Sequence, residues 1–174
     1  MDFKGKTVIV TGAGKGIGRE IVRMLAERGA QVVALTRSAA DVEALRGESG
    51  CRAIQVDLAD ADATREAAIA ALPADFLVNC AGTTELQPFL ETTVEAFDRL
   101  VAVNTRAPMI VAQEYARSLI KQGRKGAIVN VSSMAAVLGS ATQYVDYAAS
   151  KAAIDTFTIG LAREVAAEGV RVNA

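Results

Sequence analysis

Short apolar runs alternate along the chain with longer segments in which apolar residues recur at helical spacing. The runs of strand length cover residues 7–10, 31–35, 53–56, 76–78 and 127–131, and a sixth begins at Val170. The helical segments cover residues 17–28, 39–46, 60–72, 92–122 and 147–167, and the fourth of them has a break near residues 104–108. Continuous apolar runs are typical of strands buried on both faces, and apolar spacings of three and four residues are typical of helices with one buried face.

This alternation predicts a single α/β domain, a parallel sheet with helices on both faces. Because the crossovers between parallel strands are right-handed, the sheet should be doubly wound, of the Rossmann type, with strand order 3-2-1-4-5-6. A chain of 174 residues is long enough to bury one core of this kind. Ligands of such sheets bind beyond the carboxyl ends of the strands, so the functional residues are expected there.

Composition limits the available chemistry. The chain has no histidine, which excludes imidazole triads and histidine metal sites and leaves acid–base work to Tyr, Lys, Asp or Glu. Cys51 and Cys80 lack metal-ligand spacing, so no metal is expected, and they fit a reduced, cytoplasmic compartment. A formal net charge of -1 without a basic run argues against nucleic acid as a partner. The short apolar run near the N-terminus is too polar at its flanks for a signal peptide or a membrane span.

A glycine-rich turn joins the first predicted strand to the first helix. It contains Gly12, Gly14, Lys15, Gly16, Ile17 and Gly18. Glycine lets the backbone turn tightly and approach a pyrophosphate, and the helix start offers free N–H groups and the positive end of its dipole. The glycines read GxxxGxG rather than GxGxxG, and glycines also serve tight turns that bind nothing. The position between the first strand and the first helix favours a dinucleotide site.

The end of the second strand bears on the choice of dinucleotide. An acid there binds the ribose 2′-hydroxyl of NAD, whereas a nearby arginine accommodates the 2′-phosphate of NADP. This chain has Thr36 and Arg37, and no acid before Asp41, which should already lie in the next helix. Lys15, in the glycine turn, lies near the same ribose, and two cations can clamp one phosphate. Either cation alone would be an ordinary solvated charge, but the two together favour NADP(H).

Tyr147 and Lys151 are four residues apart on a predicted helix and therefore share one face. A free tyrosine has a pKa of about 10, and lowering it by about three units requires roughly 4 kcal/mol of preference for the phenolate. One cation about 4 Å away, at an effective dielectric constant of about 20, supplies energy of that order. Such a pair taken alone also fits a surface tyrosine packed on a lysine stem. Ser132 and Ser133, which close the fifth strand, add a hydroxyl that can hydrogen-bond a substrate carbonyl.

The glycine turn, the strand-end segment 79–82, the serines and the Tyr-Lys pair, in this order, resemble the short-chain dehydrogenase/reductase family over the whole chain. The family motif TGxxxGxG matches residues 11–18, NNAG matches 79–82 with Cys80 replacing the second Asn, and YxxxK matches 147–151. The interval from Ser133 to Tyr147 is one residue longer than is usual in the family. Residues 12–19, 36–37, 86–91 and 126–134 are most similar to the carbonyl reductases of L-xylulose and dicarbonyls, which are NADPH-dependent tetramers.

The resemblance implies a role for each site residue. Tyr147 would donate the proton, Lys151 would lower the tyrosine pKa and bind the nicotinamide ribose, and Ser133 would orient the carbonyl. Asn104 would hold a relay water through its main-chain carbonyl, and Asp57 would meet the adenine amino group. The implied cofactor-binding set is Gly12, Gly14, Lys15, Gly16, Ile17, Gly18, Thr36, Arg37, Asp57, Leu58, Asn79, Ala81, Gly82, Tyr147 and Lys151.

The implied activity is hydride transfer from NADPH to a ketone, dicarbonyl or ketose, or the reverse oxidation, by a cytoplasmic homotetramer. One alternative is reduction of 3-oxoacyl groups on an acyl carrier protein. A basic surface would favour it, and a set of five cations hints at one, although these residues also fit a solvated helix face: Arg106, Arg117, Lys121, Arg124 and Lys125. Another alternative is a non-catalytic NADP-binding scaffold, against which the presence of both Tyr147 and Lys151 argues.

The sequence stops at Ala174, where the sixth strand has just begun. The family continues past this point with a turn, a substrate-covering helix, another helix and a final strand. We therefore expect the single domain, residues 1–174, to be truncated before its substrate loop. The expected behaviour of such a chain is weak NADPH binding at most, low thermal stability and negligible reductase activity until that segment is restored.

Overall fold

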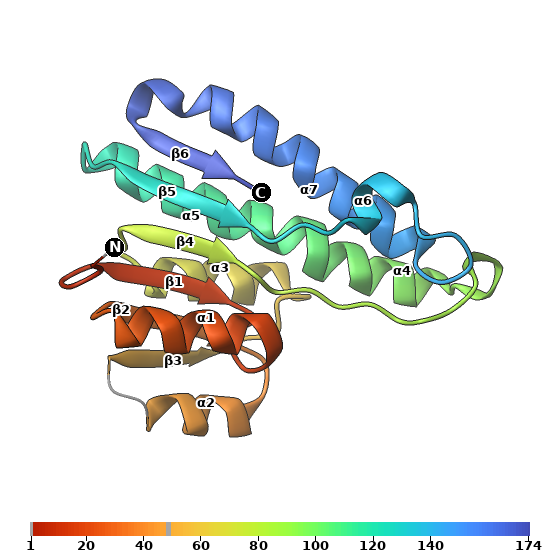
Figure 1. Ribbon diagram of the computed structural model, residues 1–174, viewed down its shortest axis with the longest axis horizontal. Coiled ribbons are helices and arrows are strands. Elements are labelled where there is room, and N and C mark those ends of the chain that lie inside the picture. Colours follow the sequence, from red (N-terminus) through yellow and green to blue (C-terminus); the bar gives the residue numbers. More distant parts are fainter. Residues whose placement is uncertain (1, 48–49) are drawn as a thin grey trace.

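A computed structural model of the chain describes residues 2–47 and 50–174. Its six strands are all parallel and form one sheet in the order β3-β2-β1-β4-β5-β6 (Figure 1). The strands are β1 (Thr7–Thr11), β2 (Gln31–Thr36), β3 (Cys51–Gln55), β4 (Phe76–Asn79), β5 (Gly126–Asn130) and β6 (Val170–Asn173). The predicted α/β class, the parallel sheet and the strand order 3-2-1-4-5-6 are confirmed.

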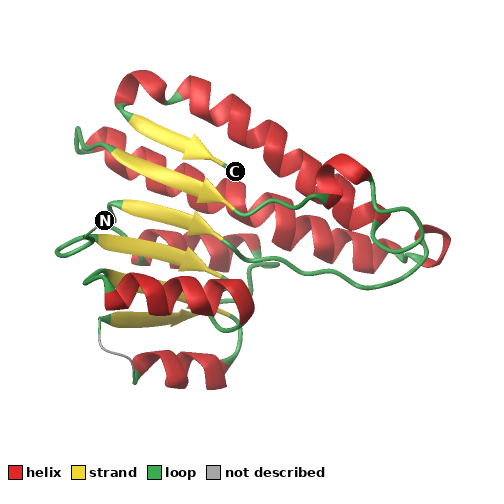
Figure 2. Ribbon diagram, viewed as in Figure 1, coloured by secondary structure: helices red, strands yellow, loops and turns green. Residues whose placement is uncertain are grey.

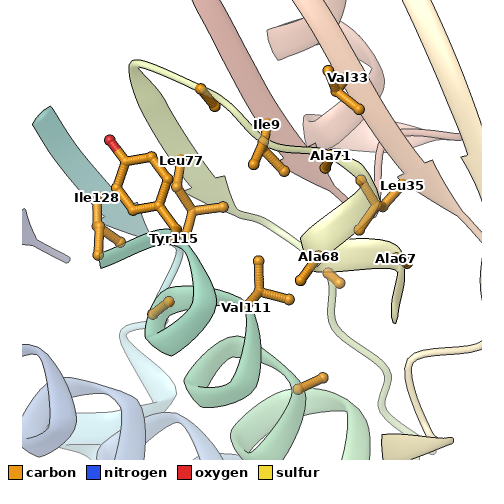
Figure 3. Close-up of a cluster of buried hydrophobic side chains, with 14 of the residues drawn as sticks. Ile9, Val33, Leu35, Ala67, Ala68, Ala71, Leu77, Val111, Tyr115 and Ile128 are labelled. Atoms are coloured by element: carbon orange, nitrogen blue, oxygen red, sulfur yellow. The ribbon is translucent and has the colours of Figure 1, made fainter. Parts of the chain in front are cut away.

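Helices lie on both faces of the sheet (Figure 2). The helices α1 (Gly16–Glu27) and α2 (Ala39–Arg46) cover one face, where Val8 and Val32 pack with Val22 and Leu45. The helices α3 (Ala61–Ala70), α5 (Ala107–Lys121) and α7 (Val145–Glu164) cover the other face. The core on that second side contains Ile9, Leu35, Leu77, Ala68, Val111 and Tyr115 (Figure 3). Neighbouring residues of β1 thus point to opposite faces, which is why its run is apolar throughout.

The long helical segment of the sequence is continuous where a break was predicted. After Thr93, which caps it, come α4 (Val94–Val101), a π-helical turn η2 (Ala102–Arg106) and α5 without interruption. The α-helix is therefore interrupted near the predicted place, but by a π-helical turn, and the chain does not leave the helix there. Pro108 has no N–H to give the carbonyl of Asn104 four residues earlier, and the helix accommodates this by widening for one turn instead of ending.

Two short helical segments were not predicted, because three or four residues are too few to show a helical period. They are η1 (Phe89–Glu91) and α6 (Ala135–Leu138). The last predicted helix also differs at both ends. It begins at Val145, two residues before Tyr147, and it stops at Glu164. The short 3₁₀ helix η3 (Ala166–Glu168) follows it and leads into β6.

Neither a membrane-spanning helix nor a metal cluster is found in the described residues. Over the described ranges 2–47 and 50–174, none of the helices is sufficiently long and apolar to cross a membrane. In the same residues no three side chains of His, Cys, Asp or Glu gather in a way that would hold a metal ion.

Candidate active site

The carboxyl ends of the parallel strands lie along one edge of the sheet, where the arrowheads of Figure 1 point. The glycine turn follows β1, the Thr36–Arg37 pair ends β2, Asp57 follows β3, and the serines follow β5. The register of the sheet puts Thr11 of β1 beside both Leu35 of β2 and Asn79 of β4. Segments far apart in the sequence therefore meet at this edge.

Backbone contact joins the glycine turn to the segment that follows β4. A Cβ added at Gly12, whose φ is +67°, would lie 2.6 Å from the Cα of Ala81. A Cβ at Gly18 would overlap the carbonyl oxygen of Gly12. Thr11 Oγ1 accepts hydrogen bonds from the N–H groups of Cys80 and Ala81, each at 3.1 Å. The two segments thus form one rigid unit in which larger residues would not fit.

The start of α1 keeps its N–H groups available. Lys15 is its exposed N-cap and makes no side-chain capping bond among the described residues, whereas Ser38 and Asp60 cap α2 and α3. Gly16 has a φ of +56°, and the side chain of Ile17 in the first turn is 66% exposed. An uncapped helix start with exposed neighbours can hold an anion such as a pyrophosphate.

These contacts predict a large effect for Gly18→Ala. The added methyl meets the backbone of Gly12, so the turn must shift, and we expect the free energy of unfolding to fall by about 1–3 kcal/mol. We also expect NADPH affinity to fall at least about tenfold, since 1.4 kcal/mol of lost binding corresponds to that factor. Thermal unfolding followed by circular dichroism and a fluorescence titration with NADPH measure the two effects.

Gly160→Ala is the matched control, because Gly160 lies inside α7 with nothing within 4 Å of an added Cβ. We expect it to raise the free energy of unfolding by about 0.5–1 kcal/mol and to leave NADPH affinity unchanged. Wild-type affinity in Gly18→Ala would show that the turn does not carry the cofactor.

The end of β2 holds an acid that the sequence analysis did not place there. Thr36 Oγ1 donates a hydrogen bond to Asp41 Oδ2 at 3.3 Å, and a Cβ at Gly14 would lie 2.5 Å from Thr36 Oγ1 and 2.6 Å from Asp41 Cγ. The carboxylate of Asp41 therefore touches the glycine turn, although Asp41 belongs to α2 as expected. The sequence feature that could have predicted this contact is the Ser38-x-x-Asp41 spacing. Ser38 Oγ accepts from the N–H of Asp41, and an acid at this helix position turns back toward the strand end.

Asp57, after β3, is held by two partners. Its carboxylate accepts a hydrogen bond from the N–H of Ala59 at 3.0 Å and pairs with Arg99 of α4 at 3.2 Å. The Ala59 bond first, and then Arg99 with a smaller contribution from Arg37, hold the pKa of Asp57 below its usual value. Arg99 was not anticipated, since it is 42 residues away in sequence. Arg37 and Lys15 are both exposed at the same edge.

Two members of the expected cofactor set point into the protein. Asn79 Nδ2 donates to Asn130 Oδ1 at 2.9 Å and to the carbonyl of Pro108 at 3.3 Å, so its amide ties β4 to β5 and to α5. The side chain of Leu58 lies in the core, and its carbonyl accepts from the hydroxyl of Thr64. Only the main chain of these two residues is placed to meet a ligand.

Asn104 is completely buried in the π-helical turn, and its side-chain amide is fully engaged by the protein. Its Oδ1 accepts from the N–H of Thr83 at 2.8 Å, while its Nδ2 donates to the Thr83 carbonyl at 2.9 Å and to Ser150 Oγ at 3.1 Å. These bonds lock the segment after β4 against α7. Any water that Asn104 holds must therefore meet its main-chain carbonyl, which lies four residues before Pro108 and receives no N–H from it.

Lys151 is 4% exposed, and its ammonium group lies at the centre of the site. Its Nζ donates to the carbonyl of Val131 at 2.7 Å and lies 5.8 Å from the centroid of the Tyr147 ring. A Cβ at Gly82 would be 3.6 Å from both Lys151 Nζ and Asn104 Oδ1. The fold thus brings together residues that lie in three separate parts of the sequence: Tyr147 with Lys151, Gly82, and Asn104.

Burial dominates the electrostatics of this lysine. It lowers the pKa of Lys151, while Cys80 and Asp155 act in the opposite direction. Burial also raises the pKa of the Cys80 thiol, against the influence of Lys151. Cys80 is thus a neutral thiol near neutral pH, and Lys151 provides the positive charge beside Tyr147.

Tyr147 and the two serines complete the group. The ring of Tyr147 meets that of Tyr144 edge to face, with centroids 6.0 Å apart. Ser133 Oγ accepts from the N–H of Ala135 at 3.1 Å, which leaves its own proton free for a donor bond. Ser132 Oγ is buried without a hydrogen-bond partner in the described part of the chain. The hydroxyl of Ser133 is therefore the better prepared of the two to donate to a carbonyl.

Comparison with known proteins adds to this geometry. The model of a family described as short chain dehydrogenase matches residues 6–174. L-xylulose reductase of Bos taurus is 48% identical over 177 residues, which cover 100% of this chain and 72% of that protein. Carbonyl reductase (NADPH) 2 of Sus scrofa is 43% identical over 175 residues, covering 100% of this chain and 71% of that protein. The solved structure of a blue fluorescent protein from a metagenomic library, in complex with NADPH, matches with a TM-score of 0.88 at 34% identity. That match covers 99% of this chain and 74% of that one.

Proposed function

The chain belongs to the short-chain dehydrogenase family, and on this premise we propose that it uses NADPH to reduce a ketose or a small dicarbonyl to the alcohol. As a member of the family it is an oxidoreductase that acts on CH–OH and C=O groups. The observation that carries the proposal is the buried Lys151 ammonium beside the Tyr147 ring, at the edge where the glycine turn opens. The similar proteins named for reduction of L-xylulose and for NADPH support the substrate class and the cofactor.

The residues at the carboxyl edge fit a dinucleotide. The glycine turn leaves no room for a Cβ at Gly12 or Gly18, and the start of α1 offers uncapped N–H groups for a pyrophosphate. Lys15 and Arg37 are exposed cations that suit a 2′-phosphate. Asp57 and the main chain of residues 79–82 would flank the adenosine. When bound, the nicotinamide cofactor supplies the hydride.

The protein supplies the proton and holds the carbonyl. The Ser133 hydroxyl donates a hydrogen bond to the carbonyl oxygen, and the Tyr147 hydroxyl gives its proton to that same oxygen. The Lys151 ammonium stabilises the phenolate that Tyr147 leaves behind, and it would also bind the nicotinamide ribose. The Asn104 carbonyl would hold the water through which Lys151 and Tyr147 regain a proton.

The basic surface that would favour a carrier-linked substrate is reduced by contacts within the protein. Three of the five cations that hinted at a basic surface are engaged within the protein. Arg117 pairs with Glu114 at 2.9 Å, Arg124 pairs with Asp75 at 2.9 Å, and Arg106 bonds the carbonyl of Ala59. We therefore keep the small-molecule carbonyl as the proposed substrate.

A cytoplasmic homotetramer is the assembly we propose, as the family resemblance implies. Exposed apolar side chains on α4, α5 and α7 support an oligomer: Val94, Phe97, Ile120 and Ile159. Light scattering coupled to gel filtration measures the mass, and a monomer at micromolar concentration would contradict this part of the proposal.

Oxidation of NADPH in the presence of L-xylulose, diacetyl or an acetoacetyl thioester tests the activity. We expect turnover with the first two and little with the thioester from a protein that spans the full length of its relatives, of which this chain covers about 72%. Turnover confined to the thioester would favour the carrier-linked reaction. NADPH binding without turnover of any carbonyl compound would favour a binding scaffold.

The variant Thr36→Asp tests the cofactor. The new carboxylate would face the 2′-phosphate and offer an acceptor to a ribose 2′-hydroxyl, so we expect the ratio of NADPH to NADH affinity to fall at least about tenfold. Thr36→Val, which removes the hydroxyl without adding charge, separates the effect of the lost hydroxyl from that of the added charge. Isothermal titration with each cofactor measures the ratio, and tighter binding of NADH than NADPH by the unchanged protein would refute NADP(H) preference.

A further inference from the structure

The carboxylate of Asp41 lies beside the end of the second strand. It lies against Gly14 of the glycine turn and accepts the hydroxyl proton of Thr36, the last residue of β2. An acid at the end of β2 recognises the ribose 2′-hydroxyl of NAD. Here the strand ends in a threonine, and α2 places an acid 3.3 Å from the hydroxyl oxygen of that threonine.

This arrangement decides what Thr36 can offer a ligand. An ionised carboxylate only accepts, so the single hydroxyl proton of Thr36 is directed to Asp41 Oδ2. The oxygen of Thr36 then presents lone pairs, which accept from a 2′-hydroxyl but cannot donate to a 2′-phosphate. A phosphate would have to draw this proton away from Asp41.

Asp41 also reduces the positive charge that Lys15 and Arg37 place at this edge. Lys15 and Arg37 together carry two positive charges at this edge, and the carboxylate of Asp41 reduces the local sum to one. A phosphate that carries about two negative charges is therefore drawn less strongly than the cations alone would draw it. A neutral ribose hydroxyl gains an acceptor instead.

We infer that Asp41 is a specificity-determining residue, whose carboxylate weakens the preference for the 2′-phosphate enough that the site accepts NAD(H) beside NADP(H). The inference rests on the proposed function, because it concerns the adenosine end of the same cofactor site. Lys15 and Arg37 favour binding of NADP(H), and the Thr36–Asp41 pair reduces the size of that preference.

A purely structural role for Asp41 makes a different prediction. An acid in the first turn stabilises a helix through the dipole, and Asp41 stands in that position in α2. If this were all, its loss would loosen α2 and weaken both cofactors alike. Only a role at the ribose changes the ratio of the two affinities.

The test is isothermal titration of the protein with NADPH and with NADH, in the unchanged chain and in Asp41→Asn. Asparagine keeps the shape and an oxygen that accepts from Thr36, and it removes the charge. We expect the ratio of NADPH to NADH affinity to rise about fivefold, which corresponds to about 1 kcal/mol, the size of one charge pair at about 4 Å in water. Glu43→Gln is the matched control. Glu43 lies on the same helix, pairs with Arg46 at 2.7 Å in solvent, and should leave the ratio unchanged.

The outcomes separate the two proposals. Failure of a protein that spans the full length of the L-xylulose reductases to bind either cofactor would refute the proposed function itself. Normal binding with an equal ratio in Asp41→Asn and the unchanged chain would overturn the role of Asp41 and leave the function standing. Circular dichroism shows whether the variant folds, and Asp41→Ser is a second uncharged variant. Unfolding of both would also overturn the inference, because the carboxylate would then be needed for the fold.

Discussion

Tyr147→Phe is expected to lower the rate of carbonyl reduction by at least about a thousandfold while NADPH affinity changes by less than about twofold. Proton transfer from a positioned side chain contributes typically about 10²–10⁴-fold, and a phenylalanine side chain has no proton to give. The ring itself would remain, with its edge-to-face contact to Tyr144 and its place beside the Lys151 ammonium. The variant therefore removes one oxygen from the site and leaves the packing of α7 unchanged.

The matched control is Tyr144→Phe, three residues earlier and in contact with the same ring. If the phenol of Tyr147 is the acid, Tyr144→Phe should retain nearly all of the rate. Single-turnover measurements with NADPH and diacetyl compare the chemical step, and titration of NADPH fluorescence compares binding. Retention of most of the rate by Tyr147→Phe, or an equal loss in both variants, would show that the proton comes from elsewhere.

The sequence predicts those parts of the molecule that depend on residues close together along the chain. Apolar runs such as that of β1 show a strand buried on both faces, and strand–helix alternation then leaves few topologies, because crossovers are right-handed. The glycine turn can be predicted for the same reason, because the strand before it and the helix after it are its neighbours in the sequence. The lysine of the Tyr-Lys pair is found by its spacing, but its burial and its bond to Val131 are not.

What the sequence leaves out are contacts made by long side chains between elements. Asp41 reaches the glycine turn from α2, and Arg99 reaches Asp57 from α4, through the packing of helices whose relative positions the local pattern does not contain. The π-helical turn at Asn104 is a related case. Pro108 signals a disturbance, but whether the helix ends or widens depends on the bonds of Asn104 to Thr83 and Ser150, which only the folded chain brings together.

The burial of Lys151 has a consequence for stability that differs from its consequence for function. Its pKa is lowered mainly by burial, so the folded state disfavours the charged form relative to the unfolded chain. The charge therefore costs stability at any pH below the lowered pKa, and this cost fades as the pH rises from there toward the ordinary lysine value of about 10.5. The carbonyl of Val131 offsets part of it by accepting the ammonium proton.

Lys151→Met is accordingly expected to abolish function without unfolding the protein. Methionine fills a similar volume and removes the buried charge, at the cost of leaving the Val131 carbonyl unpaired, about 1–3 kcal/mol. Burying a single ammonium group costs several kcal/mol, so the two effects should nearly cancel. We expect the midpoint of thermal unfolding to stay within about 4 °C, which is about 1 kcal/mol for a chain of this size.

The catalytic consequences of Lys151→Met should be large, because the phenolate of Tyr147 loses its cation and the cofactor ribose loses a donor. We expect the reduction rate to fall at least about a thousandfold, since the phenolate that forms on proton transfer no longer has a cation beside it, and NADPH affinity to fall at least about tenfold. Lys121→Met on α5, where the lysine is exposed, is the control and should alter neither. Tyr147→Phe spares cofactor binding, so loss of binding in Lys151→Met alone would separate the two roles. A fall in thermal stability that accounts for the lost activity would instead make Lys151 a structural residue, and an unchanged rate would remove it from the proposed mechanism.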